Sequence, residues 1–110
     1  MPVRSVRRRY LWIHTETPHE INYELLHKLI ENKVHFLYGV KGAEEMNFRL
    51  IEYLFKDHDA IIRCNHSRLN EMRAALAHIT SVNADPIRID VKRVSGTIKS
   101  LKKYIHPTRV

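Results

Sequence analysis

The chain has 110 residues, which suits a single domain with one hydrophobic core. Its one cysteine, Cys64, excludes an internal disulfide and a cysteine-rich zinc site, and no apolar run approaches the roughly 18 residues of a membrane span, so a cytoplasmic protein is expected. The formal net charge of +7, from 19 basic and 12 acidic residues, favours a polyanion as the partner.

The basic residues gather at the two ends of the sequence. Residues 1–10 contain four arginines and no acid, and residues 91–110 contain six lysines and arginines and no acid. The segment between them holds nine basic and all 12 acidic residues, a net charge of −3, whereas the two ends together carry +10. This separation indicates a polyanion bound through the termini, and two charged tails that aid solubility are the alternative.

The first part of the chain predicts a strand followed by a long helix. Residues 9–15, RYLWIHT, are rich in aromatic and β-branched side chains, which is typical of a strand. The segment TPHE at residues 17–20 combines a threonine N-cap, a proline at the first helical position and a glutamate three residues after the cap. Apolar residues then recur at helical spacing until Gly39, which offers a left-handed stop, and residues 40–46 are expected to form a loop.

The middle of the chain predicts a hairpin and a second helix. Residues 47–55 and 60–64 are strand-like and are joined by the polar turn KDHD at residues 56–59. Ser67 is the expected N-cap of the next helix, because a serine hydroxyl oxygen can accept a backbone N–H at a helix start. The apolar residues of this helix share one face and are Leu69, Met72, Leu76 and Ile79.

The last part predicts a break, a strand and a short basic helix. Residues 83–86 interrupt regular structure, and the alternation of apolar and polar residues over 87–92 indicates a half-buried strand. Residues 97–105 then predict a helix with an apolar face. The residues of that face are Ile98, Leu101 and Ile105.

This order of elements predicts an α+β fold over residues 1–110 as one domain. Two split βαβ units give a ferredoxin-like, RNA-recognition-like βαββαβ sandwich with a four-stranded antiparallel sheet and an appended C-terminal helix. In this topology the first and fourth strands lie side by side and antiparallel. We therefore expect residues 7–9 to lie near Lys92 and Arg93, so that the basic segment 1–10 and the basic helix 97–105 share one edge.

The basic residues near this edge are candidates for contacts with RNA phosphates. Lys99 and Lys103 share a face of the final helix, whose first turn has no acid and can be capped by Ser95 or Thr97. A solvated helix face and a charged guard on an edge strand are the alternatives. The predicted RNA-binding residues are Arg7, Arg8, Arg9, Arg63, Arg68, Lys92, Arg93, Lys99, Lys102 and Lys103.

Aromatic residues suggest a second surface. Tyr10 and Trp12 alternate onto one face of the first strand, which in an RNA-recognition domain would stack on bases, but the third strand has no matching aromatic residue. Core packing or a protein interface is the better interpretation of these two residues. The predicted interface residues are Tyr10, Trp12, Phe48 and Tyr53.

Catalytic and metal-binding patterns are lacking in the sequence. The eight histidines are scattered without the spacing of a closed metal site, so no metal site is predicted. Cys64 has no motif that would make it reactive and is expected to be a small buried apolar residue. We find no catalytic set of residues.

Four segments of the chain resemble a known family. RRRYLW, FRLIEY, IIRCNHSRLNEMRAALAHIT and VSGTIKSLKKYI follow one another over nearly the whole sequence. In this order they are similar to archaeal ribonuclease P protein component 2, the counterpart of the eukaryotic Pop-five subunit.

The resemblance implies a protein that works inside a ribonucleoprotein endoribonuclease. In that family the ribonuclease P RNA, with Mg²⁺, removes the 5′ leader of precursor tRNA, and the protein helps the catalytic domain of the RNA adopt its active form. The implied partners are this RNA, a TIM-barrel protein subunit and a second copy of the chain within a heterotetramer, without a membrane. No catalytic residue and no cofactor bound by the chain itself is expected.

Two other functions stay open from the residues alone. A free-standing single-stranded RNA-binding module would depend on Tyr10 and Trp12 more than on the lysines. A ferredoxin-like metabolic enzyme or ligand-sensing domain would require a polar pocket with paired catalytic groups.

Overall fold

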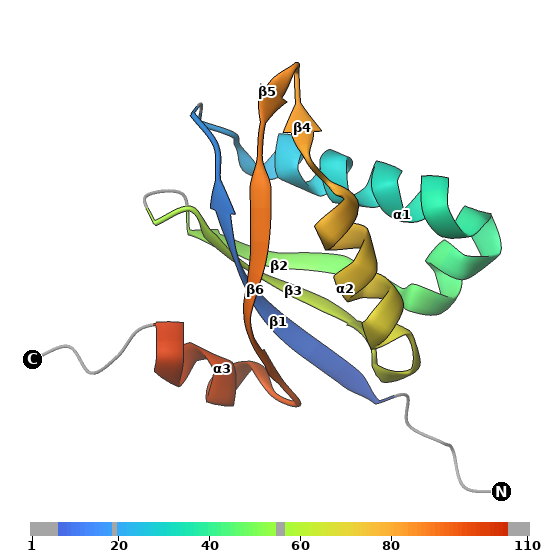
Figure 1. Ribbon diagram of the computed structural model, residues 1–110. Coiled ribbons are helices and arrows are strands. Elements are labelled where there is room, and N and C mark those ends of the chain that lie inside the picture. Colours follow the sequence, from blue (N-terminus) through green and yellow to red (C-terminus); the bar gives the residue numbers. More distant parts are fainter. Residues whose placement is uncertain (1–6, 19, 55–56, 106–110) are drawn as a thin grey trace, which may run out of the picture.

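The computed structural model describes residues 7–18, 20–54 and 57–105, and Figure 1 shows how their elements are arranged. The predicted order of elements is confirmed, with a short two-stranded ribbon, β4 and β5, added around the predicted break. The elements are β1 (Arg8–Glu16), α1 (Tyr23–Met46), β2 (Arg49–Leu54), β3 (Asp59–Asn65), a 3₁₀ turn (His66–Arg68), α2 (Leu69–His78), β4 (Ser81–Val82), β5 (Asp85–Pro86), β6 (Arg88–Ser95) and α3 (Ile98–Ile105).

The main sheet is antiparallel throughout and has the strand order β2-β3-β1-β6. The first and last long strands, β1 and β6, are therefore neighbours, as the split βαβ topology predicts. Tyr10 lies opposite Ser95 and Trp12 lies opposite Arg93 in this pair. The start of β1 thus lies beside the end of β6, so residues 7–10 and 92–95 lie at the same end of the sheet.

One face of the sheet packs on α1 and α2 and forms the main core (Figure 1). Successive side chains of a strand point to opposite faces, so Leu11 and Ile13 of β1 face the helices and are fully buried. The predicted apolar face of α2 is confirmed: Met72, Leu76 and the C-cap residue Ile79 are buried, and Leu69 is partly buried against the same core. We call this side of the sheet the core face and the other side the open face.

The predicted start of the first helix is wrong. Thr17, Pro18 and Glu20 precede the helix, which begins at Tyr23. Asn22 is the N-cap, and its side-chain oxygen accepts a hydrogen bond of 2.8 Å from the backbone N–H of Leu25. Ile21 explains why the helix begins later than predicted. It is buried in the core just before the cap and holds the connection against the sheet.

Gly39 interrupts the first helix without ending it. Its φ of 73° lies in the left-handed region that favours glycine, so the predicted break is present. The expected loop over residues 40–46 is nevertheless helical, and α1 resumes and runs to Met46, which is fully buried. The helix ends at Asn47, which is left-handed and donates its backbone N–H to Ala43 O.

The cap expected at Ser67 is also absent. Residues 66–68 form a 3₁₀ turn that leads into α2, and no side chain caps either element. The break predicted at residues 83–86 contains the turn of the small ribbon, where Asn83 and Ala84 have positive φ angles of 49° and 71°. The hairpin of β2 and β3 is confirmed, although residues 55 and 56 of its turn lie outside the described residues.

Candidate nucleic-acid interface

Because of the strand register, the side chains of the open face form rows that run across the strands. In β1, Tyr10, Trp12 and His14 alternate with the buried residues and therefore point to the open face. One row across the sheet consists of Arg49, Arg63, Tyr10 and Ser95. The next row consists of Glu52, Ile61, Trp12 and Arg93. A third, towards the far end of β1, consists of Leu54, Asp59, His14 and Asp90.

The first of these rows makes one end of the open face basic. Arg49 and Arg63 lie opposite each other on β2 and β3, and Arg8 lies one strand further, opposite Asn65. Arg49 is exposed and was not among the residues predicted from the sequence. The hairpin could have indicated it, because an antiparallel partner of Arg63 must come from the beginning of the preceding strand.

The arginines of the N-terminus reach the turn that leads into α3. Nη1 of Arg9 lies 3.6 Å from the position that a Cβ atom would occupy at Gly96. On the other side of β1, the backbone N–H of His66 donates to Arg7 O over 2.8 Å. The N-terminal arginines therefore lie between the end of β3 and the connection from β6 to α3.

The predicted cap of the final helix is present. Ser100 N–H donates to Oγ1 of Thr97 over 3.2 Å, and Thr97 N–H donates to Oγ of Ser95 over 3.3 Å. Lys99 and Lys103 are exposed, whereas Leu101 has no exposed surface. The exposed lysines of α3 therefore follow the end of β6, beside which β1 begins.

Two predicted RNA-binding residues have acidic partners within the chain. Arg68 forms ion pairs with Glu45 and Glu71, and these carboxylates raise the pKa of its guanidinium. Nζ of Lys102 lies 2.9 Å from Oε1 of Glu52. Phosphate contacts by Arg68 or Lys102 would have to displace these carboxylates.

The other predicted cations have no ion pair within the described part of the chain. This set comprises Arg7, Arg8, Arg9, Arg63, Lys92, Arg93, Lys99 and Lys103. Lys92 sits at the bulge of β6, between Val91 and Arg93, and is exposed. They lie at the start of β1, near the end of β3, at the end of β6 and on α3.

The opposite end of the open face is acidic. Asp59 Oδ1 lies 2.7 Å from Nδ1 of His14, and Asp90 lies opposite His14 on the other side. Arg88 is held there by Glu16 and Asp90, at 3.2 and 3.1 Å. A phosphate backbone would therefore be attracted to one end of this face and repelled by the other.

The four aromatic residues of the predicted interface do not share a surface. Phe48 and Tyr53 pack against the core, and the hydroxyl of Tyr53 donates to Ile21 O over 2.7 Å. Tyr10 and Trp12 instead lie on the open face. The expectation of one aromatic patch fails because a bulge between Leu50 and Glu52 changes the alternation of β2 and turns Tyr53 to the core face.

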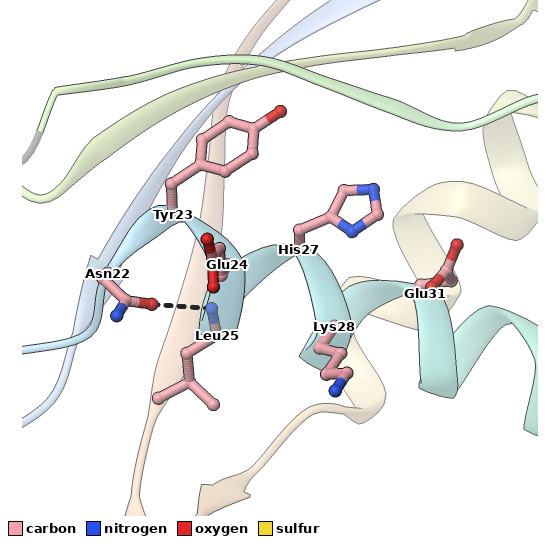
Figure 2. A pocket seen from close by; sticks show the side chains of 7 residues that line it. All are labelled: Asn22, Tyr23, Glu24, Leu25, His27, Lys28 and Glu31. Atoms are coloured by element: carbon pink, nitrogen blue, oxygen red, sulfur yellow. Dashed lines mark hydrogen bonds between the residues drawn. The ribbon is translucent and has the colours of Figure 1, made fainter.

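A groove of about 660 Å³ runs along the first turns of α1, and Figure 2 shows the side chains that line it. Tyr23 and His27 stack with their ring centroids 6.2 Å apart, and the hydroxyl of Tyr23 donates to Leu50 O over 2.6 Å. Lys28 points to the other side of the helix in Figure 2. The charged residues of the lining are Glu24, Glu31 and Lys28, so the groove carries a net negative charge and does not suit a phosphate.

Cys64 is buried in the core. Burial raises the pKa of the Cys64 thiol to about 11, and only 1% of the residue is exposed, as predicted for a small buried apolar residue. Within residues 7–18, 20–54 and 57–105, no three His, Cys, Asp or Glu residues come together as metal ligands. No helix in these ranges has the length and apolar character required to cross a membrane.

Comparisons with known proteins agree with the fold. The sequence model of the Rpp14/Pop5 family matches residues 9–106. Ribonuclease P protein component 2 of Halobacterium salinarum is 30% identical over 69 residues, which cover 61% of this chain and 42% of that protein. The protein of the same name from Methanobrevibacter smithii is 25% identical over 111 residues, covering 94% of this chain and 92% of that protein.

A solved structure shows the same fold. A chain in the cryo-EM structure of yeast ribonuclease MRP matches with a TM-score of 0.68 and 15% sequence identity, over 94% of this chain and 92% of that chain. The alignment with the Halobacterium protein spans less than half of that protein's length. The alignments with the Methanobrevibacter protein and with the yeast chain span nearly all of each.

Proposed function

This chain belongs to the Rpp14/Pop5 family, and on that premise we propose that it is a protein subunit of a ribonuclease P ribonucleoprotein. Its proposed ligand is the ribonuclease P RNA. The observation that carries this proposal is the meeting of the two basic ends of the chain, where Arg9 lies against Gly96 at the start of the α3 segment. Charges far apart in the sequence thereby form one cationic surface at one end of the sheet.

The proposed work of this surface is electrostatic. Cations that pair with phosphates release condensed counterions and allow RNA segments to approach each other closely. Mg²⁺ would then be held by the phosphates of the RNA, which performs the hydrolysis that removes the 5′ leader of precursor tRNA. The chain itself would contribute no catalytic residue and no bound cofactor to the endoribonuclease.

Protein partners are part of the same proposal. The family resemblance favours a TIM-barrel subunit and a second copy of the chain as neighbours in the particle. The exposed apolar residues Phe36 and Val40, at 80% and 67% exposure, lie on α1 and not on β1, β6 or α3, and could be covered by protein while the RNA is bound.

The decisive test removes two unpaired lysines of α3. The double variant Lys99→Ala, Lys103→Ala should bind ribonuclease P RNA more weakly and require more Mg²⁺ for cleavage by the reconstituted particle, while its fold is retained. Roughly six phosphate contacts give a log-log slope of affinity against salt of about −5, so the loss of two contacts should leave about −3.5.

The matched control removes two exposed lysines of α1, in the variant Lys28→Ala, Lys41→Ala. It loses the same charge on another part of the molecule and should keep the wild-type slope and Mg²⁺ requirement. Equal slopes for the two double variants would show that net charge, and not this surface, determines RNA binding.

A further inference from the structure

α3 covers the middle row of the open face and is anchored at both ends of that row. Nζ of Lys102 pairs with Glu52 on β2 at 2.9 Å, and the guanidinium of Arg93 on β6 lies 3.5 Å from the ring centroid of Tyr104. Between these anchors, Leu101 is fully buried and Ile61 is 1% exposed. Neither Leu101 nor Ile61 belongs to the main core between the sheet and the helices.

Two buried polar groups of the open face lack a hydrogen-bond partner. Nε1 of Trp12 and Nε of Arg63 are shielded from solvent and find no hydrogen-bond partner in the described part of the chain. Trp12 lies in the covered row and Arg63 in the row beside it. Buried donors without acceptors oppose the closed arrangement, because both would regain partners on exposure.

Each anchor includes a cation that could bind a phosphate in place of its present partner. The ion pair of Lys102 is partly exposed, with 44% and 33% of the two side chains accessible, and Arg93 is an exposed residue. A phosphate carries full charge and accepts hydrogen bonds from either cation, whereas Tyr104 offers Arg93 only its ring. RNA bound at the basic end would therefore compete with Glu52 and Tyr104.

We propose that the open face beneath α3 is a second RNA-binding surface, for unpaired bases, which α3 covers until phosphates draw Lys102 and Arg93 away from Glu52 and Tyr104. The identity of the ligand as RNA rests on the proposed function. Tyr10 and Trp12, two residues apart on one face of β1, provide the rings for stacking. Arg8 and Arg63 lie beside Tyr10 to meet the backbone of the strand.

The sheet should stay folded when α3 detaches from it. α3 has eight residues, and helices of this length are marginal in water, so its order depends on docking. Its removal uncovers Ile61 and Trp12 and leaves the contacts of α1 and α2 with the core face in place.

The first experiment opens the cover in the full chain. Leu101→Asp should unseat α3, and Ser100→Asp adds the same charge at an exposed position of the helix as a control. Trp12 is the one tryptophan of the sequence, so its emission reports directly on the cover. We expect Leu101→Asp to shift this emission to longer wavelength and to bind a ten-nucleotide oligouridine about tenfold more tightly, and Ser100→Asp to do neither.

Further variants identify the surface. Trp12→Ala in the Leu101→Asp background should abolish the gain in oligouridine binding. Glu52→Gln, which keeps the core intact, should raise oligouridine affinity about threefold and shift the Trp12 emission in the same direction. Glu16→Gln removes an equivalent carboxylate, paired with Arg88 at the acidic end, and should change neither quantity.

Three results would overturn the inference. Unchanged Trp12 emission in both opened variants would mean that α3 does not cover the row. A shifted emission without a gain in oligouridine affinity, or a gain that survives Trp12→Ala, would mean that the uncovered face is not the binding surface. These results are independent of the α3 lysine test with ribonuclease P RNA, so the proposed function and this inference can fail separately.

Discussion

Burial of the single residue Cys64 makes the stability of the protein depend on pH. It lies on the core face of β3 opposite Arg9, and desolvation raises its pKa to about 11 while the charge of Arg9 opposes that shift. The thiol is therefore neutral at physiological pH and contributes as a small apolar side chain. The ordinary pKa of 9.0 applies once the chain unfolds.

The stability of the protein should consequently fall as the pH rises above 9. The unfolded thiol loses its proton from about pH 9, whereas the folded thiol keeps it to about pH 11, so ionisation favours the unfolded state in this window. The loss has a limit of about 1.4 kcal/mol per pH unit. Urea unfolding at pH 8, 9 and 10 should show this decline in the wild type.

Cys64→Ala supplies the comparison for this prediction. The variant should be less stable at every pH because of its cavity, but should decline less between pH 8 and 10. Tyr38 and Tyr53, whose pKa values are also raised by burial, are present in both proteins and cancel in the difference. Parallel declines would show that Cys64 does not titrate differently in the folded state.

Individual side chains also decide which cations are available. Arg68 and Lys102 count equally with Arg49 and Lys103 in the net charge, yet Glu45, Glu71 and Glu52 already neutralise the first two. The formal charge of +7 already includes these carboxylates, so it does not tell which cations are unpaired or where they lie.

At the level of elements, the start of α1 depends on the competition between two caps. Asn22 accepts the N–H of Leu25 and has Tyr23 as the first helical residue, whereas the threonine and proline of the TPHE segment remain in the connection. Asparagine ranks above threonine as an N-cap, and the burial of Ile21 fixes the chain direction immediately before it.

Asn22→Ala should therefore lower the free energy of unfolding by about 1 kcal/mol. Asn22→Asp should keep most of the stability, since its carboxylate can accept the same hydrogen bond and favours the positive end of the helix dipole. Urea unfolding of the two variants beside the wild type measures both effects. If the alanine variant were as stable as the aspartate variant, the side-chain hydrogen bond of Asn22 would not stabilise the start of α1.

α3 is an element whose order depends on a small balance. Burial of the Leu101 side chain contributes about 1.5–3 kcal/mol, while an unsatisfied buried donor such as Nε1 of Trp12 costs about 1–3 kcal/mol. These terms are of the same size. The docked helix is thus open to competition from a strong ligand in a way that α1 and α2, which share the main core, are not.

At the scale of the whole molecule, the open face is polarised from end to end. Arg8, Arg49 and Arg63 lie at the end where β1 begins, and Asp59 and Asp90 lie towards the end where it finishes. The antiparallel pairing of β1 with β6 adds the basic end of β6 to the first group. An RNA backbone is thereby directed to one end of the sheet.

Arg49 tests this polarity, with Arg88 as its control. Arg49→Ala should weaken binding of ribonuclease P RNA severalfold and reduce the magnitude of the salt slope by about 0.9, because it removes one cation from the basic end. Arg88→Ala removes a cation that Glu16 and Asp90 hold at the acidic end, and should leave the slope unchanged. Fluorescence anisotropy over a salt series measures both variants. A larger effect of Arg88→Ala would place the RNA at the other end.

The sequence by itself determined the order of the strands and helices, the sheet topology and the separation of charge between middle and ends. Those features follow from local periodicity and from the handedness of βαβ connections, which need no knowledge of distant contacts. The neighbouring positions of β1 and β6, and with them a single basic edge, could be derived in the same way.

Only the tertiary structure decided where α1 begins, that Gly39 bends it without ending it, and which lysines and arginines have acidic partners. It also turned Tyr53 to the core and placed α3 over the row that contains Trp12. Each of these depends on strand register, on a bulge or on contacts between residues far apart in the chain. Such contacts have no local sequence signal, because the same residue types suit either outcome until the neighbouring strand or helix is in place.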